Sequence, residues 1–280
     1  MRFTRRQFIE RSALALATVP FSPLPVWAAE RPRLRVGACV VGLEAAKRAG
    51  IDGVQVGGGG AADTLDIFKP ETRARHKAQM RAAGLPICSL MMGLLNQFPL
   101  ATDSRAPAWL AQCIDAAKDL GVPNILVAFF GKGDLQTDKR IKENEFASVV
   151  KRLKETAPRA KDAGVTLAVE NMLSAEQNLR LLEAVGHESV SLYYDVYNTG
   201  KTQKYDSPTE IRKLKGRISQ VHYKNGPAYL DEDKPYFEAV SAALREIGYS
   251  GWIVLETSSP SKDTVADARR NSDFVRTLFA

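Results

Sequence analysis

Residues 164–196 read GVTLAVENMLSAEQNLRLLEAVGHESVSLYYDV, and they set out the plan of the fold. A short apolar run, Thr166–Glu170, is followed by an amphipathic stretch, Glu176–Val185, and then by a second apolar run, Ser191–Val196. Short runs rich in Val, Leu and aromatic residues are typical of buried strands. The longer stretch between them has the spacing of a helix. These residues therefore predict one strand–helix–strand unit.

The same rhythm continues in both directions from about residue 30 to the last residue. The predicted strands are Leu34–Val40, Gly53–Val56, Leu85–Met92, Asn124–Phe130, Thr166–Glu170, Ser191–Val196, Ile218–Tyr223 and Trp252–Glu256. The clearest helices between them are Glu71–Ala83, Ala106–Leu120, Glu143–Ala163, Glu176–Val185 and Tyr236–Ile247. Glycine suits the left-handed residue that ends a helix, and it follows four predicted helices at Gly84, Gly121, Gly164 and Gly248. Such units repeated over about 250 residues predict an α/β fold, a (β/α)8 TIM barrel, as a single domain over residues 29–280.

An open, doubly wound sheet is the main alternative to a closed barrel. It predicts a glycine-rich phosphate-binding turn after the first strand. The glycine run at residues 57–60 follows the second strand instead, and it lacks the GxGxxG spacing. No linker-like stretch divides the chain after residue 30. The sequence therefore favours the barrel.

The first 28 residues have the features of an export signal. Adjacent arginines, Arg5 and Arg6, precede a modest apolar stretch, and small residues follow up to Ala28. This order is typical of a secretory signal peptide, and the paired arginines resemble the twin-arginine export motif. Prolines between residues 20 and 25 interrupt the apolar stretch well short of the ~20 residues that a membrane span needs. We expect a signal peptide over residues 1–28, cleavage near Ala28, passage through the twin-arginine export machinery to the periplasm or medium, and no stable membrane span.

Charge and cysteine content exclude two further classes of protein. The formal net charge of the 280 residues is +7, and +3 of it lies within residues 1–28. The rest is spread without a basic run, so we expect no nucleic-acid partner. Cys39, Cys88 and Cys113 are an odd set without close spacing and predict no disulfide framework. A homo-oligomer is compatible with this composition.

Four consecutive predicted strands end in side chains that can bind a metal. The strands end LAVE at residue 170, LYYD at 195, SQVH at 222 and IVLE at 256, spacings of 25, 27 and 34 residues. In a barrel these ends converge at the face where active sites are built. Three carboxylates brought together without a cation would repel one another and raise one another's pKa values. The set predicts one divalent metal ion held by Glu170, Asp195, His222 and Glu256. Mn2+ is the metal we expect, and Mg2+, Co2+ and Zn2+ are the alternatives.

The same segments resemble a known family. Val169–Asn171, Tyr194–Asn198, Val221–Lys224 and Ile247–Glu256 match recurrent blocks of the xylose isomerase-like barrel superfamily, in its sugar phosphate isomerase/epimerase branch. These motifs cover the C-terminal half of the chain, whereas the N-terminal half is similar in rhythm alone. The resemblance implies that the four strand-end residues hold one divalent metal. The related endonuclease branch uses several zinc ions and many histidines, so we do not expect DNA repair.

The resemblance also implies a reaction and a carbohydrate substrate. A metal that chelates a carbonyl and an adjacent hydroxyl acidifies the C–H bond between them and stabilises an enediolate. In the ketose 3-epimerases of the family, the glutamates that match Glu170 and Glu256 remove the proton and return it. By this resemblance both residues are catalytic as well as metal-binding.

Three more residues are candidates for the site. Strand alternation places Lys224 on the same inward face as His222, where it can act as an electrophile, as an acid or as a substrate-binding group. Asn171 and Asn198 lie just beyond two of the ligands and are expected to bind sugar hydroxyls or to orient the ligands.

Some positions depart from the ketose 3-epimerases. The segment Val196–Asn198 lacks the second histidine often found there, Asn225 stands in place of a common acidic residue, and Asp231–Asp233 replaces a Gly-Glu-Gly loop. Three functions therefore stay open. The first is a metal-dependent isomerase or epimerase of a sugar or keto-sugar. The second is a lyase that acts on a 3-keto-glycoside with the same metal site and Lys224 as the acid. The third is a non-catalytic periplasmic barrel that binds carbohydrate or metal.

Overall fold

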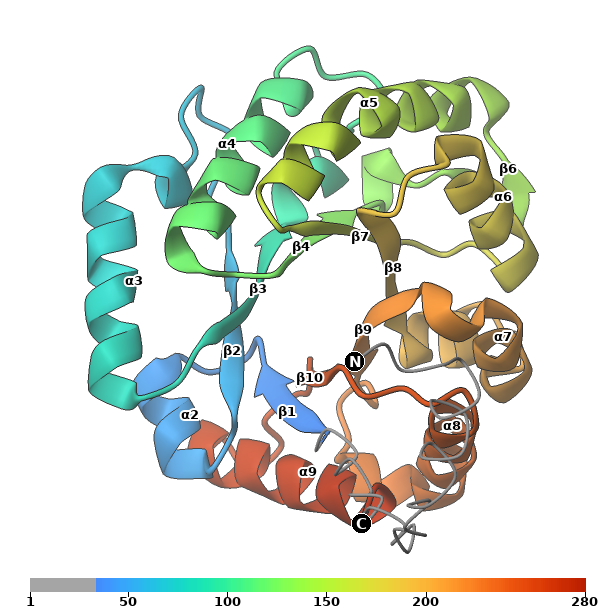
Figure 1. The fold of residues 1–280 in the computed structure, drawn as a ribbon. Helices are drawn as coiled ribbons and strands as arrows, with labels where there is room; N and C mark the ends of the chain where they lie inside the picture. Colours follow the sequence, from blue (N-terminus) through green and yellow to red (C-terminus); the bar gives the residue numbers. More distant parts are fainter. Residues whose placement is uncertain (1–33) are drawn as a thin grey trace, which may run out of the picture. The chain divides into compact units, whose positions relative to one another are not determined.

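The computed structural model describes residues 34–280, and these residues form a closed barrel of eight parallel strands surrounded by helices (Figure 1). The strands are β1 Arg35–Ala38, β2 Gly53–Gly57, β3 Ile87–Met92, β4 Asn124–Ala128, β7 Thr166–Glu170, β8 Val190–Asp195, β9 Ile218–Tyr223 and β10 Trp252–Leu255. Each strand pairs with the next along the chain, and β10 closes the barrel on β1. The predicted (β/α)8 barrel is confirmed. The predicted signal peptide and its cleavage near Ala28 lie outside the described residues.

Helices connect the strands around the outside of the barrel (Figure 1). They are α2 Leu43–Ala49, α3 Pro70–Ala83, α4 Ala106–Leu120, α5 Glu143–Asp162, α6 Ala175–Val185, α7 Ser207–Leu214, α8 Lys234–Glu246 and α9 Thr264–Leu278. A two-stranded hairpin, β5 Gln136–Thr137 and β6 Arg140–Ile141, lies between β4 and α5. Within residues 34–280, no helix combines the length and the apolar character that a membrane crossing requires.

Local sequence signals explain where several helices begin and end. Helix α6 begins with a capping box, in which the Ser174 side chain accepts from the Gln177 N–H and the Gln177 side chain accepts from the Ser174 N–H. Helix α4 ends at Gly121, whose φ of 69° is the left-handed conformation that glycine adopts without strain. The other three predicted terminal glycines also have positive φ. These signals fix the short returns from helix to strand.

The core has two parts, because each strand presents alternate side chains to opposite sides of the sheet. The larger part lies between the strands and the helices. The smaller part fills the barrel interior with Cys88, Leu126, Ala128, Ala168, Tyr193, Trp252 and Val254. Burial of such a large apolar side chain contributes about 1.5–3 kcal/mol to stability. Gly53 makes room for one of them, since a Cβ there would lie 2.8 Å from the Trp252 ring.

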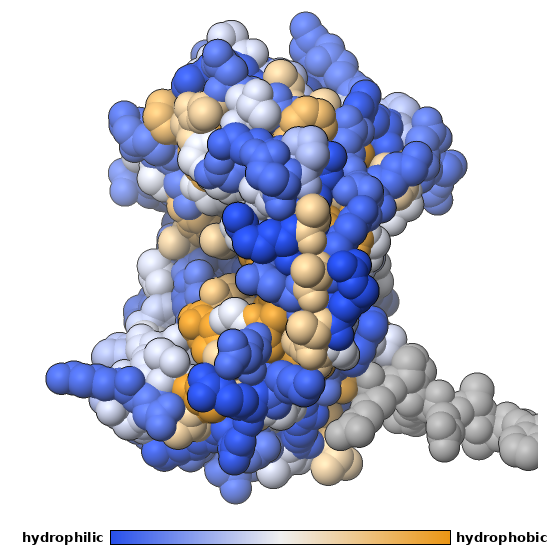
Figure 2. All heavy atoms as spheres, turned by 90° about the vertical axis from the view of Figure 1, so that its left-hand side faces the viewer, coloured by the Kyte–Doolittle hydropathy of each residue, from blue (hydrophilic) through white to orange (hydrophobic). Residues whose placement is uncertain are grey.

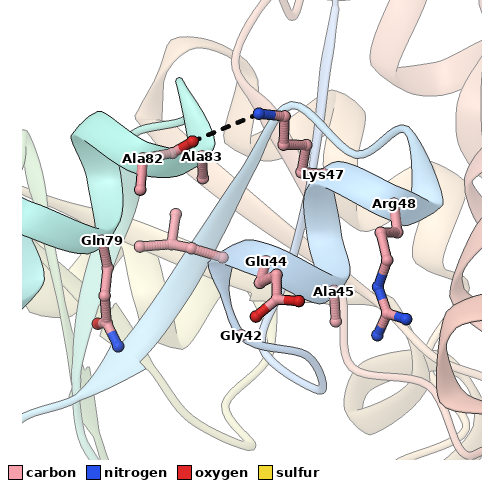
Figure 3. A pocket seen from close by; sticks show the side chains of 9 residues that line it. Gly42, Glu44, Ala45, Lys47, Arg48, Gln79, Ala82 and Ala83 are labelled. Carbon is pink, nitrogen blue, oxygen red and sulfur yellow. Dashed lines mark hydrogen bonds between the residues drawn. The ribbon is translucent and has the colours of Figure 1, made fainter.

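The flank of the barrel formed by α2 and α3 has a surface groove. Figure 2 shows this side of the molecule, where apolar surface lies in a hollow bordered by hydrophilic side chains. Gly42, α2 and the end of α3 line the groove, and Lys47 Nζ donates to the Ala82 carbonyl, 3.3 Å away (Figure 3). None of the predicted site residues lines this groove.

Candidate metal centre

Four neighbouring strands bring the predicted ligands together. Glu170 is the last residue of β7, Asp195 the last of β8, and His222 lies one residue before the end of β9. Glu256 follows β10 by one residue, and its N–H continues the strand ladder by donating to the Tyr223 carbonyl at 3.0 Å. One ligand atom from each of the four residues lies within 4.8 Å of the others. We call these four residues the ligand group.

The imidazole of His222 lies at the centre of the ligand group. Its Nδ1 is 2.9 Å from a Glu170 oxygen, 3.9 Å from an Asp195 oxygen and 3.8 Å from a Glu256 oxygen. The His222 side chain is fully buried, whereas that of Glu256 is 35% exposed. Three acidic groups around one imidazole nitrogen, with one of them open to solvent, fit a divalent metal ion that a substrate can reach.

Burial and mutual repulsion perturb the acids of the ligand group. Burial, followed by the charge of Glu170, raises the pKa of Asp195 to about 7. Burial alone would lower the pKa of His222, but the carboxylates of Glu170, Glu256 and Asp195 together outweigh it and the pKa is raised. Both shifts mean that the residues hold protons more tightly than usual. A divalent cation would oppose both shifts, because it stabilises the deprotonated carboxylate and the neutral imidazole.

Lys224 reaches into the ligand group from the end of β9. Its Nζ lies 2.8 Å from Glu256 Oε2 and 3.0 Å from Asp195 Oδ2. Burial opposes its charge, but the Asp195 and Glu256 carboxylates outweigh that effect and raise the pKa of Lys224. Lys224 is therefore an ammonium ion that holds two of the acids in place and stands beside the more exposed one.

The two candidate asparagines contact the protein in different ways. Asn171 directs its amide into the loop after β7, where Nδ2 donates to Asn178 Oδ1 at 2.9 Å and Oδ1 accepts from the Leu173 N–H at 2.9 Å. Asn198 uses its backbone, whose N–H donates to Asp195 Oδ1 at 2.7 Å. Asn171 therefore organises the loop that follows one ligand, and Asn198 orients another ligand directly.

Sequence reasoning missed the polar group below the histidine. Gln55 of β2 places its Oε1 3.2 Å from His222 Nε2, and its Nε2 donates to Ser89 and Tyr193. The Tyr193 ring lies against His222 with 4.3 Å between centroids. The signal that could have found Gln55 is a lone polar residue inside the apolar run Gly53–Val56.

The comparisons with known proteins agree with this geometry. Residues 43–278 match the family described as "Xylose isomerase-like TIM barrel". The chain belongs to this family. Most of the barrel, including every member of the ligand group, lies within the matched segment. The family predicted from the sequence is thus confirmed.

Individual relatives carry names of sugar epimerases. A 2-epi-5-epi-valiolone 7-phosphate 2-epimerase from Actinoplanes sp. is 29% identical over 194 residues, which are 68% of this chain and 68% of that protein. The structure of a D-allulose 3-epimerase from Methylomonas sp. in complex with D-allulose has a TM-score of 0.72 at 18% identity and covers 88% of this chain and 98% of its own. A 3-keto-D-glucoside 4-epimerase from E. coli has a TM-score of 0.71 at 17% identity, with 88% and 100% covered. At these identities the two structures show the shared fold.

Proposed function

We propose that this protein is a divalent-metal-dependent epimerase or isomerase of a sugar or keto-sugar. The observation that carries the proposal is the convergence of Glu170, Asp195, His222 and Glu256 within 4.8 Å at the carboxyl ends of the strands. The family of the chain and the sugar epimerases among its relatives support the same reaction class. We further propose Mn2+ as the metal, because an oxygen-rich set with a single imidazole suits it.

The side chains divide the work of proton transfer. A divalent cation bound by the ligand group would supply Lewis acidity and acidify the C–H bond beside the substrate carbonyl. Glu170 and Glu256 stand on β7 and after β10, so we assign one, as a carboxylate, to remove the substrate proton and the other, as a carboxylic acid, to deliver a proton of its own. Lys224 holds Glu256 in its ionised, proton-accepting form through the 2.8 Å contact. Asp195 accepts from the Asn198 N–H at 2.7 Å, and we assign it no proton transfer.

A second candidate is a lyase that acts on a 3-keto-glycoside. The position of the Lys224 ammonium favours it, because an acid 2.8 Å from the proposed base can protonate a departing glycosidic oxygen. The first step, removal of the proton beside the keto group, is the same in both reactions. The two candidates differ in whether the C–O bond then breaks.

Solvent exchange tests both candidates at once. We would incubate the Mn2+-loaded protein in D2O with D-allulose, D-fructose and a 3-keto-glucoside, and follow deuterium beside the carbonyl by NMR. Epimerised, deuterated sugar supports the epimerase, and release of the aglycone supports the lyase. Bound metal with no exchange on any of these substrates contradicts both and favours a non-catalytic barrel.

We also propose that residues 1–28 direct export to the periplasm through the twin-arginine machinery. The paired Arg5 and Arg6 before a modest apolar stretch support this. Periplasmic protein that begins near residue 29, and its loss in an Arg5→Lys/Arg6→Lys variant, are the expected results. Unprocessed protein retained in the cytoplasm by the unaltered chain would contradict the proposal.

A further inference from the structure

The side of His222 that faces away from the ligand group has its own partner. His222 Nδ1 faces the carboxylates, whereas Nε2 faces Gln55 Oε1 at 3.2 Å. Both side chains are buried in the barrel interior, with Gln55 3% exposed and His222 fully buried. Water does not compete for the hydrogen bond, and an unpaired polar atom there would be costly. The contact therefore constrains the state of the imidazole.

Two hydroxyl groups accept hydrogen bonds from the amide nitrogen of Gln55. Its Nε2 lies 2.8 Å from Ser89 Oγ and 3.1 Å from Tyr193 OH, and both hydroxyls can accept from it. With the amide nitrogen in this position, the amide oxygen faces His222 Nε2. A reversed amide would present N–H groups to Nε2, which would require the imidazole proton to be on Nδ1. That tautomer has no lone pair on Nδ1 for a metal.

We propose that Gln55 is a positioning residue that holds His222 with its proton on Nε2 and its lone pair on Nδ1 directed at the metal. Ser89 and Tyr193 act through Gln55 by keeping the amide in its productive orientation. The inference rests on the divalent metal of the proposed function. It adds that the affinity of the site for metal through His222 of β9 depends on residues of β2, β3 and β8.

The arrangement links opposite sides of the barrel. Strands β2 and β3 lie across the closed sheet from β8 and β9. The Tyr193 ring also packs on the imidazole, with 4.3 Å between centroids, so the same residue that anchors the amide limits rotation of the histidine. A metal ligand fixed in both tautomer and ring angle loses less entropy when the metal binds.

Matched variants test the proposal. Gln55→Met keeps the size of the side chain and removes the acceptor, whereas Gln55→Glu keeps an acceptor toward which Ser89 and Tyr193 can turn their hydroxyl protons. Gln220→Met is the control, because Gln220 is an equally buried glutamine of the barrel that donates instead to the Cys88 carbonyl at 3.0 Å. Mn2+ dissociation constants would be measured by calorimetry on the full-length protein and on all three variants.

We expect Gln55→Met to weaken Mn2+ binding by about 10–100-fold, the usual effect of losing such an outer partner of a ligand. Gln55→Glu should stay within about tenfold of the unaltered protein, and Gln220→Met should bind normally. Equal weakening in Gln55→Met and Gln55→Glu, or in Gln55→Met and Gln220→Met, would trace the loss to packing and overturn the proposal. Normal binding by Gln55→Met would also overturn it. Failure of the unaltered protein to bind metal would instead overturn the proposed function together with this inference.

A spectroscopic readout separates tautomer control from general loosening. The chain has three histidines, so 15N-histidine labelling of the Zn2+-loaded protein gives few imidazole signals, and a His222→Asn variant assigns the relevant one. We expect a slowly exchanging Nε2–H for His222 that Gln55→Met converts to a rapidly exchanging one. An Nδ1–H signal from His222 in the loaded protein would overturn the assignment.

Discussion

Strands β7–β10 and strands β1–β4 form the two halves of one barrel, yet their carboxyl ends differ in chemistry. Each strand of the C-terminal half leads into one charged or imidazole ligand. The ends of the N-terminal half carry instead partly exposed side chains that pack on the barrel interior, namely Cys39, Met91 and Phe130. The C-terminal half gathers the charge in one place, whereas these side chains of the N-terminal half are uncharged.

The metal ligands come from one half of the barrel, and part of the support for the His222 ligand comes from the other half. The N-terminal half supplies no member of the ligand group, but through Gln55 and Ser89 it contacts the imidazole at the centre of that group. Acidic side chains in both halves would have added to the repulsion that, together with burial, already raises the pKa of Asp195. The ligand group is thus one-sided, and the side chains that support its imidazole from the other half are neutral.

The most severe test of this asymmetry is removal of one carboxylate from the C-terminal half. Glu256→Gln should lower the rate of proton exchange by about 10²–10⁴-fold, the typical contribution of a positioned acid or base. The fold should persist, because the Glu256 side chain is partly exposed and its backbone hydrogen bond to Tyr223 remains. Deuterium incorporation followed by NMR, with circular dichroism as a check of folding, measures both effects.

A matched control comes from the other half. Glu44 lies exposed on α2 and lines the surface groove, so Glu44→Gln makes the same chemical change away from the ligand group. We expect it to leave exchange unchanged. Full activity in Glu256→Gln would refute the assignment of Glu256 as an acid or base, and equal losses in both variants would remove the distinction between the halves.

Lys224 tests whether the charged half needs its ammonium ion for position or for a proton. Lys224→Met should lower activity by about 10–100-fold, because Asp195 and Glu256 lose the cation that holds them. Lys224→Arg keeps the charge but gives up a proton far less readily. Activity restored by Arg indicates an electrostatic role, whereas a loss in Arg as large as in Met indicates proton donation. Initial rates on each substrate measure this.

Strand ends were the part of the site that the sequence could predict. Every strand of the barrel ends within two residues of the end of a predicted apolar run. The runs are easy to recognise because strands that are buried on both faces are apolar throughout. Each ligand is the last polar residue of such a run, so counting along the chain was sufficient to find it. Helices α2, α7 and α9 were not among the clear predictions. Helices α2 and α7 have only seven and eight residues, which give little periodicity, whereas α9 has 15.

Support across the barrel could not be predicted in the same way. Gln55 and His222 are 167 residues apart, and their contact depends on the closure of the sheet and on which side chains meet inside it. Asn171 shows the reverse problem, because it adjoins a ligand in sequence while the following loop takes up both ends of its amide. Proximity along the chain indicates the strand end, whereas side-chain direction is set by the loop.

The pH dependence of metal binding tests whether the charges of the ligand group are linked to the metal. Burial and Glu170 raise the pKa of Asp195 from 3.8 to about 7, so the metal-free folded protein holds a proton there that the unfolded chain releases. The stability that Asp195 contributes is therefore present below about pH 4 and is lost as the pH rises through 7. Metal binding requires the deprotonated form and has the opposite trend.

We expect the Mn2+ dissociation constant to rise about tenfold for each unit of pH below 7, with release of one proton, and more steeply where His222 also carries an extra proton. Calorimetry between pH 5.5 and 8 in buffers of different ionisation enthalpy measures the affinity and the protons together. An affinity independent of pH across this range would show that the charges of the ligand group are not linked to metal binding.

The smallest effect is expected at the loop that follows β7, where Asn171 is predicted to bind substrate and is seen to bond within the protein. Asn171→Ala leaves the Leu173 N–H and the Asn178 amide without their partner, which should lower the free energy of unfolding by about 1–3 kcal/mol. Asn178→Ala breaks the same network from α6, one helix away from the ligand group, and is the natural control. Chemical denaturation compares their stabilities, and steady-state kinetics compares KM.

If Asn171 acts only by holding the loop, the two variants lose similar stability and their KM values move together by less than tenfold. A rise in KM confined to Asn171→Ala would mean that its amide turns toward the sugar during the reaction, and the charged half of the barrel would then hold substrate as well as metal.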